Sequence, residues 1–133
     1  MNKKYAFLMI MVLMVFSLAC GFSFSTAKIN NAYMARDIDG VLEQVDGYSQ
    51  DEVLLCVVEL SNAPDDTVVT ASWYAVNVED TEPNFLIDQA SITSGSNQLF
   101  FDLSNNILWP RGSYRVDLSI NEEFAQSVEF LIQ

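Results

Sequence analysis

Short stretches in which apolar and polar residues alternate run through most of this chain, and turn-forming residues separate them. Successive side chains of a β-strand point to opposite faces, so alternation with period 2 marks a strand that is buried on one face. In 67–76 one face carries the apolar residues Val69, Ala71, Trp73 and Ala75. After the N-terminal segment, no stretch of ten residues has the three-to-four-residue spacing of an amphipathic helix. The pattern therefore predicts an all-β fold.

The stretches predict about seven short strands with regularly spaced turns, which is typical of an antiparallel β-sandwich. The expected ranges are 28–35, 53–60, 67–76, 85–92, 98–103, 113–120 and 124–132. In the last two strands the even-numbered residues, Phe124 among them, are expected to face the core. Between 36 and 52 the sequence favours no element, except that 41–45 could form a short strand or a helical turn.

The first residues have the arrangement of an export signal. Lys3 and Lys4 precede an apolar run, 5–19, in which only Ser17 is polar. A positively charged start followed by such a run is typical of a signal peptide. The rest, 28–133, is then one domain, because about 110 residues is the length of a single small domain.

Three outcomes are open for this segment. The tetrapeptide 17–20 resembles a bacterial lipobox, with Ser17 in place of the usual Leu. Processing there would remove 1–19 as a signal peptide and leave Cys20 lipidated at the start of the mature chain.

The other two outcomes do not use the Cys. Ser25 and Ala27 form an A-x-A-like site, and cleavage by ordinary signal peptidase would remove 1–27. Counted on to residue 24, the apolar run is about 20 residues long, enough for an uncleaved membrane anchor. All three outcomes place the domain outside the cytoplasm. It would be held at the membrane by a lipid or an anchor, or be free as a secreted or periplasmic protein.

The chain carries 18 Asp+Glu against 6 Lys+Arg, a formal net charge of -12. A surface of this sign repels phosphate backbones, which argues against nucleic acid as a partner. Lys3 and Lys4 fall within the predicted signal, so the mature domain keeps 4 cations against 18 acids, a net charge of -14. The chain has no His, which excludes Ser-His-Asp and Cys-His catalysis and most zinc sites within it.

Four residues carry a family resemblance, to the immunoglobulin-like sandwich: Cys56, Trp73, Tyr114 and Val116. The resemblance implies that Trp73 packs at the centre, that Tyr114 forms a tyrosine corner, and that Val116 stands where antibody domains have their second Cys. Cys56 would then be a buried free thiol facing Val116 and Trp73, as in a disulfide-free relative of the fibronectin-III or bacterial Ig-like kind. The resemblance covers roughly 27–133 and says little about function, because this sandwich hosts adhesion modules, chaperones, inhibitors and spacers.

Two groups of residues are candidates for binding. An exposed Trp109, with Arg111 beside it, could contact a small ligand or carbohydrate; the alternative is that Trp109 packs over the end of the sandwich. Asp37 and Asp39 resemble the start of a calcium loop that Asp46 could help to complete. The alternative is a solvated acidic loop, and the Gly after Asp39 comes two residues too early for an EF-hand.

These observations favour a non-enzymatic Ig-like module that is exported, tethered to the membrane, and engaged with an unidentified protein or in a structural role at the cell envelope. A sandwich of about 110 residues has little surface for a substrate cleft, so we expect no enzyme activity and no cofactor other than Ca²⁺. The alternative is a small-ligand, carbohydrate or Ca²⁺-binding sandwich. A third hypothesis is a periplasmic chaperone or protease inhibitor that binds by strand addition at an open sheet edge.

Overall fold

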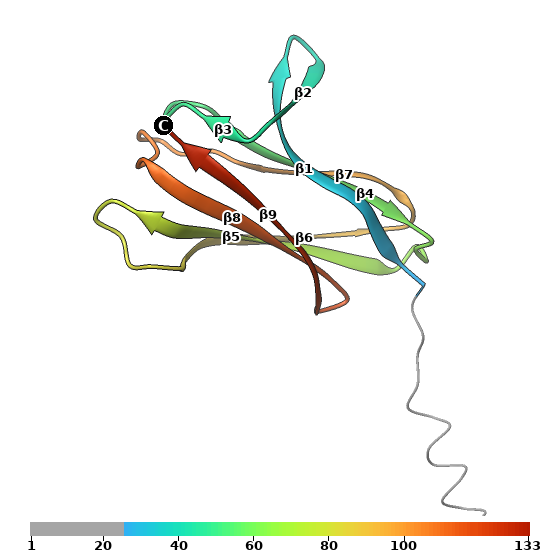
Figure 1. Cartoon of the computed structure of the whole chain (residues 1–133). Coiled ribbons are helices and arrows are strands. Elements are labelled where there is room, and N and C mark those ends of the chain that lie inside the picture. Colours follow the sequence, from blue (N-terminus) through green and yellow to red (C-terminus); the bar gives the residue numbers. More distant parts are fainter. Residues whose placement is uncertain (1–25) are drawn as a thin grey trace, which may run out of the picture.

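The computed structural model describes residues 26–133; the predicted signal segment and the lipidation candidate Cys20 lie outside these residues. Nine strands form two sheets that pack face to face (Figure 1). The all-β sandwich that the alternation predicts is therefore confirmed. Within the described part of the chain, there is no helix with the length and apolar character needed to cross a membrane.

The sheets differ in size and in strand order. The smaller sheet has the order β2 (Val41–Val45), β1 (Lys28–Ile38), β4 (Leu54–Ser61) and β7 (Asn97–Leu103). The larger sheet has the order β3 (Gly47–Tyr48), β9 (Glu123–Ile132), β8 (Gly112–Ile120), β5 (Thr67–Val78) and β6 (Phe85–Ser94). Neighbouring strands are antiparallel, except that β3 runs parallel to β9.

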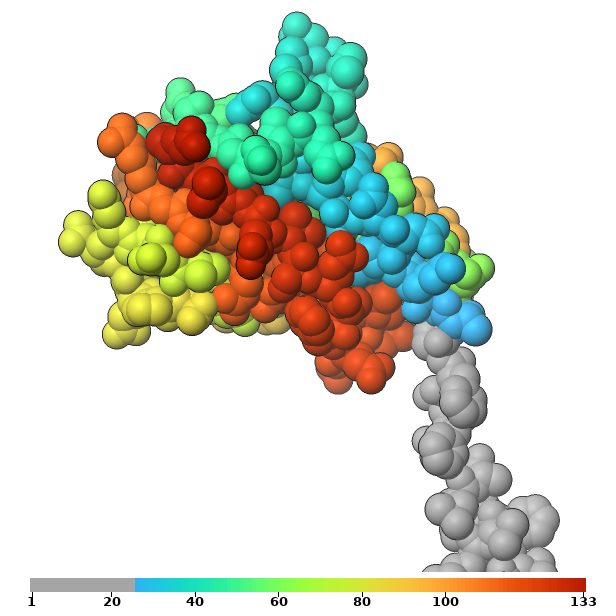
Figure 2. Space-filling view, in the orientation of Figure 1, coloured from blue at the N-terminus to red at the C-terminus, as the bar shows by residue number. Residues whose placement is uncertain are grey.

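Each predicted stretch forms a strand, and the two additional strands lie between residues 36 and 52. Residues 41–45 form β2, so the strand alternative is the one realised. The β1–β2 hairpin closes because Asp39 and Gly40 both have positive φ, 53° and 84°, as a tight two-residue hairpin turn requires. The Asp37 carboxylate accepts a 2.8 Å hydrogen bond from the Gly40 N–H and holds this turn. Figure 2 shows the hairpin standing out from the body of the sandwich.

The core lies between the inner faces of the two sheets. The predicted apolar face of β5 points into it, and Trp73 is only 2% exposed there. Trp73 is paired in register with Val116 on β8, and its ring meets Phe130 edge-on with the centroids 6.2 Å apart. Cys56, on β4 of the opposite sheet, is fully buried and carries a free thiol.

Tyr114 ties the start of β8 to the loop before it. Its ring stacks on Phe130 at 5.4 Å, and its hydroxyl donates a hydrogen bond to the Pro110 carbonyl, four residues upstream. A hydroxyl bonded to the backbone a few residues back is the contact that defines a tyrosine corner. The structure thus places Tyr114 in the role that the resemblance implies.

One prediction for the C-terminal hairpin is wrong. Phe130 is buried as expected, but Phe124 is 64% exposed. The register explains the difference, because Leu118 pairs with Gln126 whereas its neighbour Ser119 pairs with Phe124. One residue of β9 therefore has no partner on β8 and forms a β-bulge. Beyond the bulge the side chains of β9 alternate in the opposite sense, so Phe124 lies on the outer face.

Candidate functional site

The outer face of the larger sheet carries several polar pairs. Thr70 and Ser91 share a 2.8 Å hydrogen bond across β5 and β6, and the Gln89 amide donates a 3.0 Å bond to the Ser72 hydroxyl. On β8, Arg115 is paired with Asp117 at 3.1 Å. An antiparallel sheet with one buried face and one such polar face is the ordinary solvated arrangement.

The outer face of the smaller sheet is apolar at its centre. Directly opposed residues of an antiparallel pair point to the same face, so the register places Tyr33, Val57 and Phe100 side by side across β1, β4 and β7. Leu55, the next residue of β4 on this face, lies opposite Asp102 of β7. Phe100 remains 47% exposed. This face therefore offers apolar contacts in the middle of the sheet.

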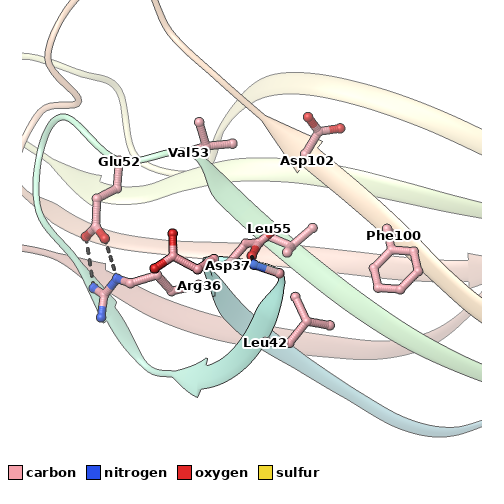
Figure 3. A pocket seen from close by; sticks show the side chains of 10 residues that line it. Arg36, Asp37, Leu42, Glu52, Val53, Leu55, Phe100 and Asp102 are labelled. Atoms are coloured by element: carbon pink, nitrogen blue, oxygen red, sulfur yellow. Dashed lines mark hydrogen bonds and ion pairs between the residues drawn. The ribbon is translucent and has the colours of Figure 1, made fainter.

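An open depression of about 980 Å³ lies at the hairpin end of this face. Its apolar lining comes from Leu42, Val53, Leu55 and Phe100. The carboxylates of Asp37, Asp39 and Asp102 lie around it. In Figure 3, Leu55 and Phe100 project from β4 and β7, and Asp102 projects from β7.

A second depression of about 460 Å³ adjoins the first and shares Glu52 and Val53 with it. It is lined by the 104–109 loop, where Ile107 is 73% and Leu108 is 60% exposed. Six of the ten large exposed apolar residues belong to these depressions or to the adjoining hairpin tip: Ile38, Val41, Val53, Phe100, Ile107 and Leu108. We call these six residues and the two depressions the hairpin-end surface.

An ion pair organises the loop under this surface. The Arg36 guanidinium binds the Glu52 carboxylate through two nitrogens, one of them at 2.9 Å. The same carboxylate accepts hydrogen bonds from the N–H and the hydroxyl of Ser49, at 2.6 and 3.0 Å. The hydrogen bonds from Arg36, opposed by partial burial, lower the pKa of Glu52 to about 2. The guanidinium also lies over the Tyr48 ring, 5.9 Å from its centroid.

Trp109 is buried, only 4% exposed, and packs over the end of the sandwich. Its indole N–H donates a 3.0 Å hydrogen bond to the Glu52 carbonyl, and its backbone N–H donates a 2.8 Å bond to the Gln50 carbonyl. Its ring also meets Tyr114 edge-on at 6.5 Å. The ring therefore has no free face for the ligand contact considered from the sequence, although Arg111 nearby is exposed.

The three carboxylates considered for calcium do not come together. Asp37 lies beside the hairpin turn, opposite Leu42, whereas Asp46 follows the far end of β2. Four residues of extended strand separate Leu42 from Asp46, which is a distance of about 13 Å. Among residues 26–133 there is no group of three or more acidic or Cys side chains placed to hold a metal ion. The calcium loop is therefore not formed as predicted, because the residues between Asp39 and Asp46 form a strand instead.

Cys56 has no chemical partner that would activate it. Burial raises the pKa of its thiol to about 12, and the thiolate is the form that reacts. Its neighbours along β4, Leu55 and Val57, are apolar. Cys56 is therefore a packing residue of the core.

The apolar side chains at the depression were missed by the sequence interpretation, although β7 carried a signal for them. Phe100 and Phe101 are adjacent in a strand, so one of them must point away from the core. Phe101 is 3% exposed and Phe100 is 47% exposed. The convergence of Leu42, Val53 and Leu55 with Phe100 has no comparable signal, because they come from different parts of the chain.

No protein-family model and no curated protein sequence matches the chain. Among solved structures, it is similar to an immunoglobulin-like protein from Pseudomonas aeruginosa, with 10% identity and a TM-score of 0.56. That similarity covers 84% of this chain and 100% of the other. The fold is therefore an Ig-like β-sandwich.

The same fold occurs within larger proteins. An alkylpurine DNA glycosylase from Pseudomonas fluorescens, bound to DNA containing an abasic site analog, is similar over 88% of this chain and 33% of its own, with 15% identity and a TM-score of 0.55. A beta-glucosidase from Listeria innocua is similar over 84% of this chain and 17% of its own, with 14% identity and a TM-score of 0.51. The chain thus spans a third or less of these two enzymes, and at such identities the likeness shows the fold alone.

Proposed function

We propose that the chain is a non-enzymatic Ig-like binding module, exported and tethered at the cell envelope, whose hairpin-end surface contacts another protein. The observation that carries the proposal is the gathering of six exposed large apolar residues at one end of the sandwich. Exposed apolar patches on soluble domains commonly mark interaction sites. The other four exposed large apolar residues lie on β6 and β9 of the larger sheet: Phe85, Leu86, Phe124 and Leu131.

The position of Thr26, the first described residue, supports presentation of this surface away from a membrane. Thr26 lies next to Asn62, to whose carbonyl its hydroxyl donates a 2.9 Å hydrogen bond. The hairpin tip is at the opposite end of β1 (Figure 1). Eleven residues of strand separate the two ends by about 35 Å. A tether before Thr26, through a lipid on Cys20 or an uncleaved anchor, would therefore leave the hairpin-end surface distal to the bilayer.

Two observations support a role without catalysis. The chain has no His, so the commonest general base is missing. The three carboxylates beside the larger depression lie on exposed residues, whereas enzyme sites usually bury the reacting groups of their substrates. The activities of the glycosylase and the beta-glucosidase belong to proteins of which this chain spans only a part.

A second candidate function is partner binding by strand addition. β6 is a ten-residue strand at the edge of the larger sheet, and Asp88 is its only charged residue. Edge strands usually carry several charges, a Pro or a bulge that discourage pairing with another chain. The pairing of β6 with β5 shifts register at residue 87, because Trp73 pairs with Asp88 whereas Tyr74 pairs with Leu86. Only 89–94 therefore forms a regular strand edge that could pair with another chain.

Membrane tethering is tested by fractionating cells that express the full chain and its Cys20→Ala variant. We expect the wild type in the membrane fraction, shortened and labelled by a radioactive fatty acid, and the variant unlabelled, because the variant has no thiol to carry a lipid. A wild type that stays in the membrane unlabelled and at full length would mean that the tether is an uncleaved anchor. A wild-type chain found in the cytosol would overturn export.

Partner contact is tested with a photo-crosslinking residue placed at Phe100 or, as the matched control, at the exposed Ser91 on β6. We expect one discrete crosslinked protein from position 100 and none from position 91. Crosslinks only from position 91 would favour strand addition at β6. Crosslinks from neither position would overturn the binding function.

A further inference from the structure

We propose that the larger depression takes a basic segment of the partner protein, in which Lys or Arg side chains flank an apolar anchor residue. The inference rests on the proposed binding function and deepens it by naming the chemistry of the partner. It follows from the residues that line the depression, from the charged residues there that have no ion pair, and from the net charge of the whole domain.

The charges beside the depression are acidic and unpaired. Arg36 is the one cation among the residues that line the depression, and it already forms an ion pair with Glu52. Asp37, Asp39 and Asp102 have no ion pair with any residue in 26–133. The Asp37 carboxylate holds the Gly40 N–H, and a carboxylate has further lone pairs to accept hydrogen bonds. Three carboxylates without an ion pair thus line the depression, and the cations of a basic partner would complement them.

The apolar lining supplies the second half of the recognition. Phe100 is 47% and Val53 is 54% exposed, and both border the depression together with Leu42 and Leu55. A partner side chain that covers these residues removes apolar surface from water on both proteins. Lys and Arg fit around such an anchor, because their long stems cover apolar surface while the charged group reaches the carboxylates.

A second copy of this chain is the wrong partner on electrostatic grounds. Residues 26–133 carry 18 acids against the 4 cations Lys28, Arg36, Arg111 and Arg115. Two of these cations, Arg36 and Arg115, are already paired within the domain. Docking one depression against another copy would bring like charges together, which opposes association. A basic partner instead gains from long-range attraction before contact.

The test pans a displayed library of random peptides of about twelve residues against the full chain held in nanodiscs of neutral phosphatidylcholine. We expect the selected peptides to be enriched in Lys and Arg next to aliphatic or aromatic residues. One selected peptide is then titrated against D37N/D102N, against F100S, and against E79Q/E82Q. The last pair removes two charges from the exposed residues Glu79 and Glu82 at the β5–β6 turn, and Asn at position 37 still accepts the bond from Gly40.

We expect the affinity to fall about tenfold in D37N/D102N at low salt, and the loss to shrink towards nothing near 1 M salt because the charges are screened. F100S is expected to lose affinity at both salt concentrations, because it removes an apolar contact. E79Q/E82Q is expected to bind like the wild type.

Three results would overturn the proposal. The first is selection of peptides without Lys or Arg, and the second is an equal loss of affinity in D37N/D102N and E79Q/E82Q, which would indicate attraction to the net charge alone. The third is a concentration-dependent dimer in sedimentation that F100S abolishes, which would assign the surface to a second copy. The first two results leave the crosslinking test at position 100 unaffected, so the inference can fail while the binding function stands. The third would also replace the other protein by a second copy of this chain.

Discussion

Tyr114 is surrounded by aromatic rings, yet its hydroxyl has a backbone partner in the Pro110 carbonyl. We predict that Tyr114→Phe lowers the free energy of unfolding by about 1 kcal/mol, because the partly buried hydrogen bond of the corner is lost. Tyr74→Phe is the matched control, since the Tyr74 ring lies under Arg115 on the outer face. Urea titration measures both variants. Equal stability of Tyr114→Phe and the wild type would show that the corner contributes no net stability.

The ion pair of Glu52 makes stability depend on pH. Its pKa in the folded protein is about 2, below the ordinary value of 4.5. A carboxylate with a lowered pKa stabilises the fold above its unfolded pKa, and this contribution is lost as the pH falls from about 4.5 towards 2. Because both side chains of the pair are partly exposed, 33% for Arg36 and 22% for Glu52, we discount the full effect to about 1–2 kcal/mol.

Glu52→Gln tests this contribution. We predict that the variant is about 1–2 kcal/mol less stable than the wild type near pH 7 and that the gap narrows near pH 3. Urea titrations at the two pH values measure it, and Glu79→Gln, which removes an exposed carboxylate, is the control. A gap that stays constant between the two pH values would mean that the Arg36–Glu52 pair is not the cause.

At the scale of the elements, the start of β8 depends on one glycine. Gly112 has φ +150°, and a Cβ there would lie 2.3 Å from the Asn77 carbonyl oxygen and 2.9 Å from the Val78 Cα. The close approach arises because β5 shifts register between Ala75 and Asn77 and brings Val78 opposite Gly112. The backbone of β5 therefore occupies the space that any side chain at 112 would need.

We predict that Gly112→Ala destabilises the domain by about 2–4 kcal/mol, because backbone must move to admit the methyl group. Gly40→Ala is the matched control. It also has positive φ, +84°, but a Cβ there meets no atom within 4 Å, so it should cost only about 1 kcal/mol of conformational strain. Thermal unfolding compares the two. Similar losses from both variants would contradict the steric explanation.

The strand pattern was largely predictable, and the exceptions have local causes. Every expected strand exists because the pattern that predicts it, alternation in most strands and a nearly continuous apolar run in 53–60, is set by the residues of the strand itself. The bulge near Phe124 and the register shift after Ala75 were not predictable, because each depends on how the partner strand pairs. β3 consists of only two residues, Gly47 and Tyr48, and so short a strand leaves no period to detect.

For the molecule as a whole, the net charge counteracts its exposed apolar surface. We predict that the triple variant D37N/D39N/D102N self-associates at concentrations where the wild type is monomeric, because the carboxylates that repel a second copy are gone. Sedimentation velocity at low salt measures the difference. A variant with three exposed acids replaced away from this surface, D65N/E79Q/E82Q, should stay monomeric. Association of both variants would show that net charge alone controls solubility.

The sequence by itself determined the all-β class, the position of most strands and the inner face of β5, because these depend on residues that are close along the chain. The N-terminal charge and apolar pattern likewise predicts export from local sequence. Only the tertiary structure decided that Trp109 is buried, that Asp46 is remote from Asp37, and that Leu42, Leu55 and Phe100 meet at one depression. Contacts of this kind depend on strand pairing, register and bulges, which join residues far apart in sequence. The candidate binding surface is therefore a product of the assembled sheet rather than of any single segment.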